Sequence, residues 1–248
     1  MKIRNKRNKL IPLIIFTIVL ALIIGMCAVY LGTYYRADEG AIVAFSTDDD
    51  ISVSTLKNGS VVFEPKNSTV GLIFYPGGQV EHNAYQPLAA ALAREGVLCV
   101  IVKMPFNLAV FNINAAEDIK EQYPKIENWY IGGHSLGGSM AASHLSNNLN
   151  DYDGLILLGS YSTSDLSSCD ISVISIYGSE DRVLNLEKYN ENKSNLPYGF
   201  SEVIIDGGCH SYFGVYGAQK GDGVPTVSNS HQIKITVEEI IKLIKSRS

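Results

Sequence analysis

The sequence contains little cysteine and lacks the common motifs that bind metals or nucleotide phosphates. It has four cysteines in 248 residues and contains neither an H-E-x-x-H nor a C-x-x-C pattern. His82, His144 and His231 also lack the spacing of metal ligands. Its glycine runs are not followed by Gly-Lys-Ser/Thr and do not show the G-x-G-x-x-G spacing of dinucleotide folds. We therefore expect no metal and no cofactor.

The four cysteines are not expected to form disulfides. Cys27 lies in a long apolar run and Cys99 in the middle of an apolar strand. Cys169 precedes its predicted strand, whereas Cys209 follows its own. If these strands are parallel, the two residues lie at opposite ends of the strands, about 20 Å apart. A disulfide needs Cα atoms within about 7 Å.

Charge is absent from a long N-terminal run. Residues 10–31 carry no charged side chain and follow an arm over 1–9 that is basic and contains no acidic residue. About 20 helical residues cross the hydrocarbon core of a bilayer, so the run predicts a transmembrane helix. By the positive-inside tendency, the N-terminus stays cytoplasmic and the remainder of the chain is extracytoplasmic.

These features divide the chain into a basic cytoplasmic arm (1–9), a retained signal anchor (10–32), a short linker (33–40) and a globular domain (41–248). The alternative is a cleaved signal peptide. Against it, the apolar run exceeds the usual 7–15 residues or so, and no small-x-small cleavage site follows. Cys27 would suit a lipoprotein, but Met26 stands where a small residue is expected. The linker limits the reach of the domain from the membrane to roughly 30 Å.

Basic residues are scarce outside the arm. Without its five basic residues, 15 basic residues face 25 acidic ones, which leaves a net charge near −10. This balance argues against nucleic-acid binding and against a polybasic membrane-docking face.

A G-x-S-x-G pattern is the strongest indication of chemistry. It reads Gly133-His134-Ser135-Leu136-Gly137, after a short β-prone run and before a helix-compatible one. A serine at a sharp strand-to-helix turn is lifted to the top of a sheet, and the glycines keep its surroundings open. The helix N-terminus favours developing negative charge. Ser135 is therefore the predicted nucleophile.

Candidates for the other members of a Ser–Asp–His triad follow in the expected chain order. Asp181 comes directly after a β-branched run, and His210 comes shortly after a later one. Glu180 and Asp206 are alternatives for the acid. Because alternate residues point in opposite directions near a strand end, Glu180 and Asp181 are not expected to face the same imidazole. His134 is expected to serve in packing and hydrogen bonding.

An oxyanion hole is predicted from the Pro76-Gly77-Gly78-Gln79 turn, which ends an apolar strand. In this arrangement, one donor comes from the loop after an early central strand and the other from the residue after the nucleophile. The predicted donors are the backbone N–H groups of Gly78, with Gln79 as second choice, and Leu136. Such a donor typically stabilises the transition state by about 3–4 kcal/mol.

The order of predicted elements indicates an α/β fold with a mostly parallel sheet covered by helices on both faces. Asn58-Gly59 predicts a type I′ hairpin at the start of the domain. Few residues separate two of the later strands, so we expect no large lid and an open cleft. The predicted strands are 70–75, 97–103, 128–133, 154–158, 171–177 and 202–206, and the predicted helices are near 84–95, 112–123 and 136–149, with a C-terminal helix that carries a capping-box pattern at Thr236.

Several motifs together resemble the membrane-anchored bacterial members of the α/β-hydrolase fold-5 group. They are Tyr75-Pro76-Gly77-Gly78, Met104-Pro105, Gly132 to Gly138, Gly178-x-x-Asp181, Gly207-Gly208-x-His210-x-x-Phe213-Gly214 and Tyr216-Gly217-x-Gln219-x-Gly221-Asp222-Gly223. The resemblance covers about residues 30–245 and implies a Ser135–Asp181–His210 triad. Related dienelactone hydrolases use cysteine at the elbow, where this chain has serine. Cys209 stands where similar sequences often have asparagine.

Together these observations predict a membrane-tethered serine hydrolase with an extracytoplasmic active site. It would cleave ester or other acyl bonds of a small molecule or an envelope component through an acyl-enzyme. The alternatives are a catalytically silent binding module on a hydrolase scaffold and an acyltransferase.

Overall fold

The computed structural model describes residues 3–43 and 50–247. The chain divides into two compact units, Met1–Tyr34 and Tyr35–Ser248. In the first unit, α1 (Ile3–Gly32) contains a stretch, Leu10–Gly32, that is long and apolar enough to cross a membrane by length and composition. Its mean hydropathy reaches 2.9. Met1 and Lys2 of the predicted basic arm lie outside the described residues.

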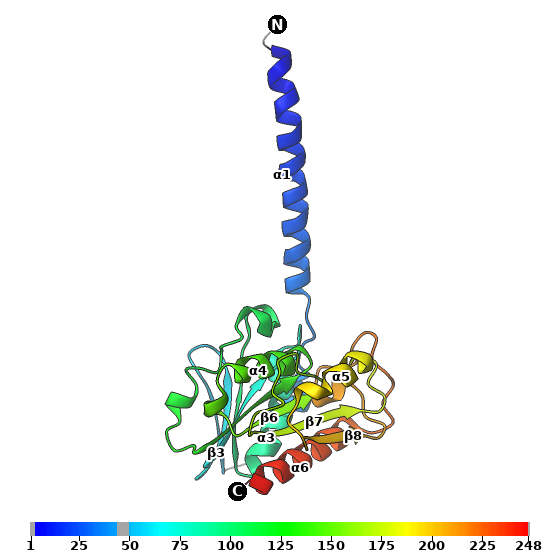
Figure 1. Ribbon diagram of the computed structural model, residues 1–248. Coiled ribbons are helices and arrows are strands. Elements are labelled where there is room, and N and C mark those ends of the chain that lie inside the picture. Colours follow the sequence, from blue (N-terminus) through cyan, green and yellow to red (C-terminus); the bar gives the residue numbers. More distant parts are fainter. Residues whose placement is uncertain (1–2, 44–49, 248) are drawn as a thin grey trace. The chain divides into compact units, whose positions relative to one another are not determined.

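An eight-stranded sheet forms the centre of the second unit, in the order β1-β2-β4-β3-β5-β6-β7-β8. The strands β3 to β8 run parallel, and β1 and β2 add an antiparallel hairpin at one edge (Figure 1). The predicted α/β sheet is therefore confirmed. The strands are β1 (Ile51–Thr55), β2 (Val61–Pro65), β3 (Val70–Tyr75), β4 (Val97–Ile101), β5 (Asn128–His134), β6 (Gly154–Leu158), β7 (Ser172–Gly178) and β8 (Ser201–Ile205).

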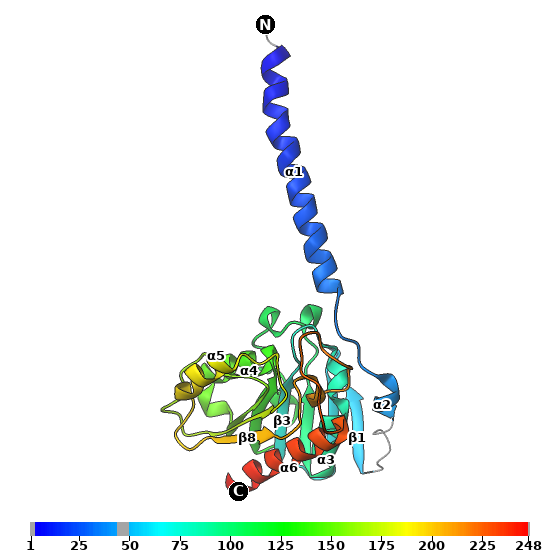
Figure 2. The same cartoon turned by 90° about the vertical axis from the view of Figure 1, so that its right-hand side faces the viewer.

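Helices cover both faces of this sheet, α3 and α6 on one side and α4 and α5 on the other (Figure 2). The side chains of β3 contribute alternately to two hydrophobic cores, one on each face of the sheet, because successive side chains of a strand point to opposite faces. Leu72 and Phe74 pack in the cluster with α3 and α6. Ile73 and Tyr75 pack in the cluster with α4. The helices of this unit are α2 (Glu39–Val43), α3 (Gln86–Arg94), α4 (Leu136–Ser146), α5 (Leu186–Asn192) and α6 (Asn229–Arg247).

The prediction of a helix near residues 112–123 is wrong. This segment forms a series of turns that ends in a short 3-10 turn, Lys120–Gln122. The reason lies in Tyr75, whose buried hydroxyl donates to the carbonyl of Ile113 at 2.7 Å and accepts from the N–H of Ala116 at 3.0 Å. These bonds occupy backbone groups that an α-helix would use for its own ladder. A tertiary contact therefore overrides the local helical preference.

Two local predictions also need correction. The hairpin at Asn58 and Gly59 forms, but only Gly59 has a positive φ, of 85°. The turn is therefore not type I′, which needs a positive φ at both residues, and it fits a three-residue loop with glycine in the left-handed position. Thr236 lies inside α6, where its hydroxyl donates to the carbonyl of Gln232 at 2.8 Å. It does not cap the helix.

The cysteines of the chain are free, as predicted. Cys169 precedes β7 and Cys209 follows β8, and these two strands are parallel. The two thiols therefore lie toward opposite ends of the parallel strands. The carboxyl ends of these strands carry the predicted site residues.

Candidate active site

Ser135 occupies a sharp turn between β5 and α4. Its backbone has φ 52° and ψ −125°, a conformation that residues with a side chain rarely adopt. Its N–H donates to the carbonyl of Leu158 at the end of β6, at 2.9 Å. Gly137 lies against the carbonyl oxygens of Tyr75 and Pro76, where a side chain would collide with the backbone. The glycine therefore allows α4 to begin directly against the end of β3.

Asp181 and His210 follow the ends of β7 and β8 and meet in the interior. Asp181 Oδ2 lies 2.7 Å from His210 Nδ1, and the two side chains are 0% and 1% exposed. The other carboxylate oxygen of Asp181 accepts from the N–H groups of Val183, at 2.9 Å, and Leu184, at 2.8 Å. These two bonds fix the orientation of the carboxylate that holds the imidazole.

The two alternative acids face elsewhere. Glu180 pairs with Arg182 at 3.0 Å. Asp206 is exposed. Of the three carboxylates considered from the sequence, Asp181 is the one bonded to His210.

The Ser135 elbow borders His210 on two sides. The ring of His134, the residue before Ser135, lies with its centroid 4.4 Å from that of His210. Gly159 follows Leu158, to which the Ser135 backbone is bonded, and a Cβ on Gly159 would lie 2.9 Å from His210 Nδ1. His210 Nε2 is buried and makes no hydrogen bond with any described residue, Ser135 included. Catalytic hydrogen bonds are often formed only when substrate is bound.

The two predicted oxyanion donors lie together. A Cβ on Gly78 would be 3.0 Å from the Leu136 side chain. The neighbouring N–H groups are engaged, that of Gly77 by the Tyr85 hydroxyl at 3.0 Å and that of Gln79 by the Asn107 carbonyl at 2.8 Å. Within the described chain, no partner takes the N–H of Gly78 or that of Leu136, which opens α4. The second-choice donor, Gln79, is thus already in use.

A buried cluster of rings surrounds His134. Its Nδ1 lies 2.8 Å from the Tyr85 hydroxyl, and its ring packs against those of Phe213 and Tyr216. Burial, together with the nearby charge of His210, lowers the pKa of His134 well below its ordinary value. His134 is therefore neutral at pH 7. Tyr85 was not predicted as a site residue, because nothing near it in the sequence marks its contact with the elbow.

Asp222 holds the backbone that carries His210. Its carboxylate accepts from the N–H groups of His210 at 3.1 Å, Ser211 at 2.8 Å and Gly223 at 2.8 Å. Burial opposes ionisation of this carboxyl, but the three N–H donors outweigh it and keep its pKa below the ordinary value. No role was predicted for Asp222, although the Gly221-Asp222-Gly223 motif that contributes to the family resemblance could have pointed to it.

An apolar rim lies beside the oxyanion loop. Phe106 and Phe111 are 59% and 57% exposed, and their rings stand edge to face with centroids 5.8 Å apart. Phe106 and Asn107 both have a positive φ, of 53° and 54°. In the described chain, the connection 159–171 between β6 and β7 contains neither helix nor strand, as the predicted lack of a large lid requires.

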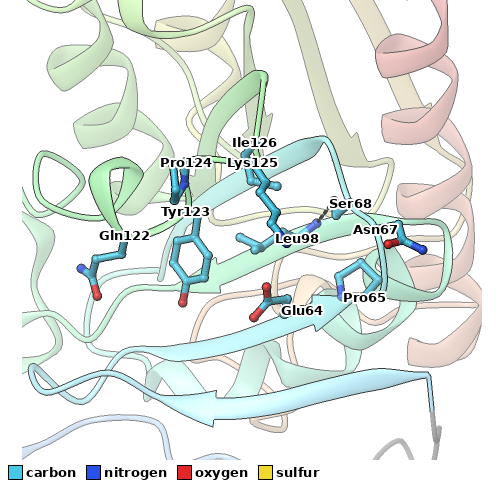
Figure 3. A pocket seen from close by; sticks show the side chains of 10 residues that line it. All are labelled: Glu64, Pro65, Asn67, Ser68, Leu98, Gln122, Tyr123, Pro124, Lys125 and Ile126. Atoms are coloured by element: carbon cyan, nitrogen blue, oxygen red, sulfur yellow. Dashed lines mark hydrogen bonds between the residues drawn. The ribbon is translucent and has the colours of Figure 1, made fainter.

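A surface cavity of about 260 Å³ lies at the amino ends of the parallel strands, away from the site (Figure 3). Ser68, Leu98 and Ile126, which line it, stand at or just before the N-terminal ends of β3, β4 and β5. Ser135, Asp181 and His210 follow carboxyl ends of strands, so the cavity is separate from them. Among the described residues, no group of His, Cys, Asp or Glu side chains is arranged to hold a metal ion.

Solved structures of other proteins share this fold. They include a dienelactone hydrolase from Anabaena variabilis ATCC 29413, with 14% identity and a TM-score of 0.58, covering 79% of this chain and 98% of that one. Est1E from Butyrivibrio proteoclasticus has 13% identity and a TM-score of 0.57, covering 79% and 100%. Carboxyl esterase 2 from Tuber melanosporum has 12% identity and a TM-score of 0.58, covering 86% and 90%. These likenesses establish the fold.

A family model matches most of the second unit. The model of the alpha/beta hydrolase family aligns with residues 71–234, which include the Ser135 elbow, Asp181 and His210. No protein with a curated description matches the chain. The match agrees with the resemblance inferred from the motifs, and the chain therefore belongs to the alpha/beta hydrolase family.

Proposed function

We propose that this hydrolase is a serine esterase in which Ser135 is the nucleophile, His210 the general base and Asp181 the residue that orients the base. One observation carries the proposal. Asp181 binds His210 through Nδ1, and this leaves Nε2 buried, unpaired and next to the elbow that bears Ser135. An imidazole held in this way has its basic nitrogen free to accept a seryl proton.

The reaction would proceed through an acyl-enzyme. Ser135 Oγ attacks the acyl carbonyl carbon while His210 Nε2 takes its proton, and Asp181 stabilises the resulting imidazolium. The N–H groups of Gly78 and Leu136 bind the oxyanion of the tetrahedral intermediate. His210 then returns the proton to the leaving oxygen. Water, activated by the same nitrogen, releases the acid and restores Ser135.

An ester is the substrate class that the comparisons favour. Of the proteins with the same fold, one is described as carboxyl esterase 2 and another as a dienelactone hydrolase. An unlidded rim suits a small or polar acyl group, or an acyl group on an envelope component. No step in this mechanism calls for a metal or a cofactor.

We also propose that the enzyme is tethered to the cell membrane, with residues 1–9 as a cytoplasmic arm, 10–32 as a retained signal anchor, 33–40 as a linker and 41–248 as an extracytoplasmic hydrolase domain. The support is the length and composition of the apolar stretch Leu10–Gly32, which is long enough to cross a membrane. An uncharged helix that is apolar all round suits a lipid environment.

The test measures labelling by a fluorophosphonate probe and hydrolysis of a p-nitrophenyl ester series by the full-length protein in detergent. Wild type should label, and Ser135→Ala and His210→Ala should lower kcat by at least about 10⁴-fold. Asp181→Asn should lower it by about 10⁴-fold. Glu180→Gln and Asp206→Asn are the matched controls and should stay within about twofold of wild type.

The controls also decide between the candidate acids. If Glu180→Gln or Asp206→Asn is as inactive as Asp181→Asn, the assignment of the acid is wrong. A folded wild type that neither labels nor hydrolyses any ester would instead indicate a binding module. Labelling without release of free acid, but with transfer to an added alcohol, would indicate an acyltransferase.

A further inference from the structure

Part of the predicted linker (33–40) is packed on the rest of the second unit. Residues 35–38, here termed the linker strap, make hydrogen bonds to two separate loops of the second unit. Ala37 N–H donates to the Glu81 carboxylate at 3.1 Å, and Asp38 N–H donates to the Val215 carbonyl at 2.7 Å. The first partner lies at the end of the oxyanion loop, and the second follows His210.

Tyr35 is the residue of the strap that reaches both loops itself. Its N–H donates to the Gln79 carbonyl at 2.7 Å, and its own carbonyl accepts from Glu81 N–H at 2.9 Å, in a parallel bridge opposite Val80. Its hydroxyl accepts from Lys220 N–H at 3.0 Å, and its ring lies 5.7 Å from that of Tyr216, centroid to centroid.

The backbone bridge acts next to the oxyanion donor. Gln79 follows Gly78 and has a positive φ of 57°, which is costly for a residue with a side chain. Its N–H is held by Asn107 and its carbonyl by Tyr35, so both of its peptide groups are fixed from outside the loop. Without the Tyr35 bond, the loop is free to relax toward an ordinary conformation and to turn the Gly78 N–H away.

The side chain of Tyr35 acts on the loop behind the base. Tyr216, against which it packs, contacts the ring of His134 with centroids 6.4 Å apart. Lys220, which it binds, is two residues before Asp222, whose carboxylate holds the N–H of His210. The Tyr35 side chain therefore supports the segment that contains Asp222, and Asp222 in turn holds the backbone of His210.

We propose that Tyr35 is a positioning residue for the active site, one that ties the oxyanion loop (residues 76–81) to the base loop (residues 211–222) and so sets the distance between the oxyanion donors and His210. The inference rests on the proposed function for its catalytic consequence, but the tie between the two loops is independent of it. Tyr35 touches no substrate in this role and acts through Gly78 and His210.

The experiment compares Tyr35→Ala, Tyr35→Phe and Ile42→Ala in the full-length protein in detergent. Ile42 packs on the same core from α2 but is not part of the strap, so its variant controls for simple loosening of the N-terminal segment. With p-nitrophenyl acetate, Tyr35→Ala should lower kcat about tenfold, less than the loss of a whole oxyanion donor, with KM within about twofold of wild type. Tyr35→Phe keeps the ring and should recover most of kcat.

Amide hydrogen exchange provides the second readout. Tyr35→Ala removes the ring and the hydroxyl but keeps the backbone bonds to Gln79 and Glu81, so residues 211–222 should exchange faster than in wild type. A fourth variant, Tyr35→Pro, also lacks the N–H that binds the Gln79 carbonyl, so residues 76–81 should exchange faster in it as well, while α4 and the central strands should not change. The proposal is overturned if Tyr35→Ala keeps the wild-type kcat, if Ile42→Ala lowers kcat as much, or if Tyr35→Pro leaves the exchange of either loop unchanged. If wild type and Ser135→Ala hydrolyse the ester equally slowly, the proposed function fails, and the exchange data still decide whether Tyr35 joins the loops.

Discussion

At the scale of single residues, Ser135 combines a reactive hydroxyl with a backbone conformation that favours glycine. Its φ of 52° and ψ of −125° are held by the bonds of its N–H to Leu158 and of its carbonyl to Ser160 and Ser139. Conformations of this kind cost of order 1–3 kcal/mol and persist where the surroundings enforce them. The elbow therefore stores strain at the predicted nucleophile.

Replacing Ser135 by glycine should relieve that strain. We expect Ser135→Gly to be inactive. Its unfolding free energy should be about 1 kcal/mol higher than that of Ser135→Ala, which also lacks the hydroxyl but keeps the Cβ. Urea unfolding monitored by circular dichroism measures the difference. An alanine variant as stable as the glycine variant would show that the turn carries no such strain.

His134 should make the stability of the fold depend on pH. Its pKa in the folded state is lowered, first by burial, so the folded protein does not bind the proton that the unfolded chain binds below about 6.5. The stability that depends on a neutral His134 is therefore complete above about pH 6.5 and is lost as the pH falls below it. The loss approaches about 1.4 kcal/mol for each pH unit.

The test is a comparison of wild type with His134→Gln. Between pH 7.5 and 5.5, the unfolding free energy of wild type should fall by about 1 kcal/mol more than that of the variant. His82 and His144, whose pKa values burial also lowers, are present in both proteins and cancel. Parallel pH profiles for the two proteins would mean that His134 is protonated in the folded state or accessible to water.

The residues of the proposed triad were identifiable from the sequence because each has a short signal beside it. Ser135 lies in G-x-S-x-G, and Asp181 and His210 each follow a β-branched run. Tyr35 and Tyr85 had no such signal. Their roles depend on contacts across the fold, with Gln79 and Lys220 for the first and with Gly77 and His134 for the second.

At the scale of elements, the segment between β4 and β5 differs most from its sequence prediction. It was expected to contain a helix and instead forms turns that present Phe106 and Phe111 to solvent. The strands β3, β5, β6, β7 and β8 were found within one or two residues of their predicted ends. Strand signals are local, whereas the 112–123 segment depends on the Tyr75 hydroxyl, which lies far away in the sequence.

The Tyr75 hydroxyl should therefore be required for the shape of this segment. Tyr75→Phe leaves the Ile113 carbonyl and the Ala116 N–H without their partner, and we expect a loss of about 1–3 kcal/mol in the unfolding free energy. Tyr130→Phe is the matched control, because the Tyr130 side chain is buried and its hydroxyl makes no hydrogen bond with a described residue. Equal effects of the two substitutions would contradict the account.

Local exchange should accompany the change in stability. In Tyr75→Phe, the amides of residues 112–119 should exchange faster than in wild type, whereas those of β6 and β7 should be unaffected by local opening. Unchanged protection of 112–119 would show that other contacts hold these turns.

At the scale of the whole molecule, the chain separates into an apolar helix and a hydrolase unit. Composition was enough to predict both parts, because an uncharged run at one end and alternating β and α patterns elsewhere are strong signals. Composition does not decide whether the helix is kept as an anchor or removed as a signal sequence, since both carry an apolar run near the N-terminus.

We expect the helix to be kept. Protein expressed in a bacterial host should remain in the membrane fraction after washing at high pH, and its intact mass should include residues 1–32. A C-terminal alkaline phosphatase fusion, which is active only after export, should be active. A mature protein that begins after residue 32, or an inactive fusion in stable membrane-bound protein, would contradict the retained anchor or its orientation.

The bonds of the linker strap determine what shedding by a protease would do. A cut before Tyr35 would free a diffusing enzyme with its two active-site loops still clamped together. A cut inside residues 35–38 would free a diffusing protein in which that clamp is broken. The position of one scission, a few residues either way, would thus decide whether the released protein keeps its full activity or loses much of it.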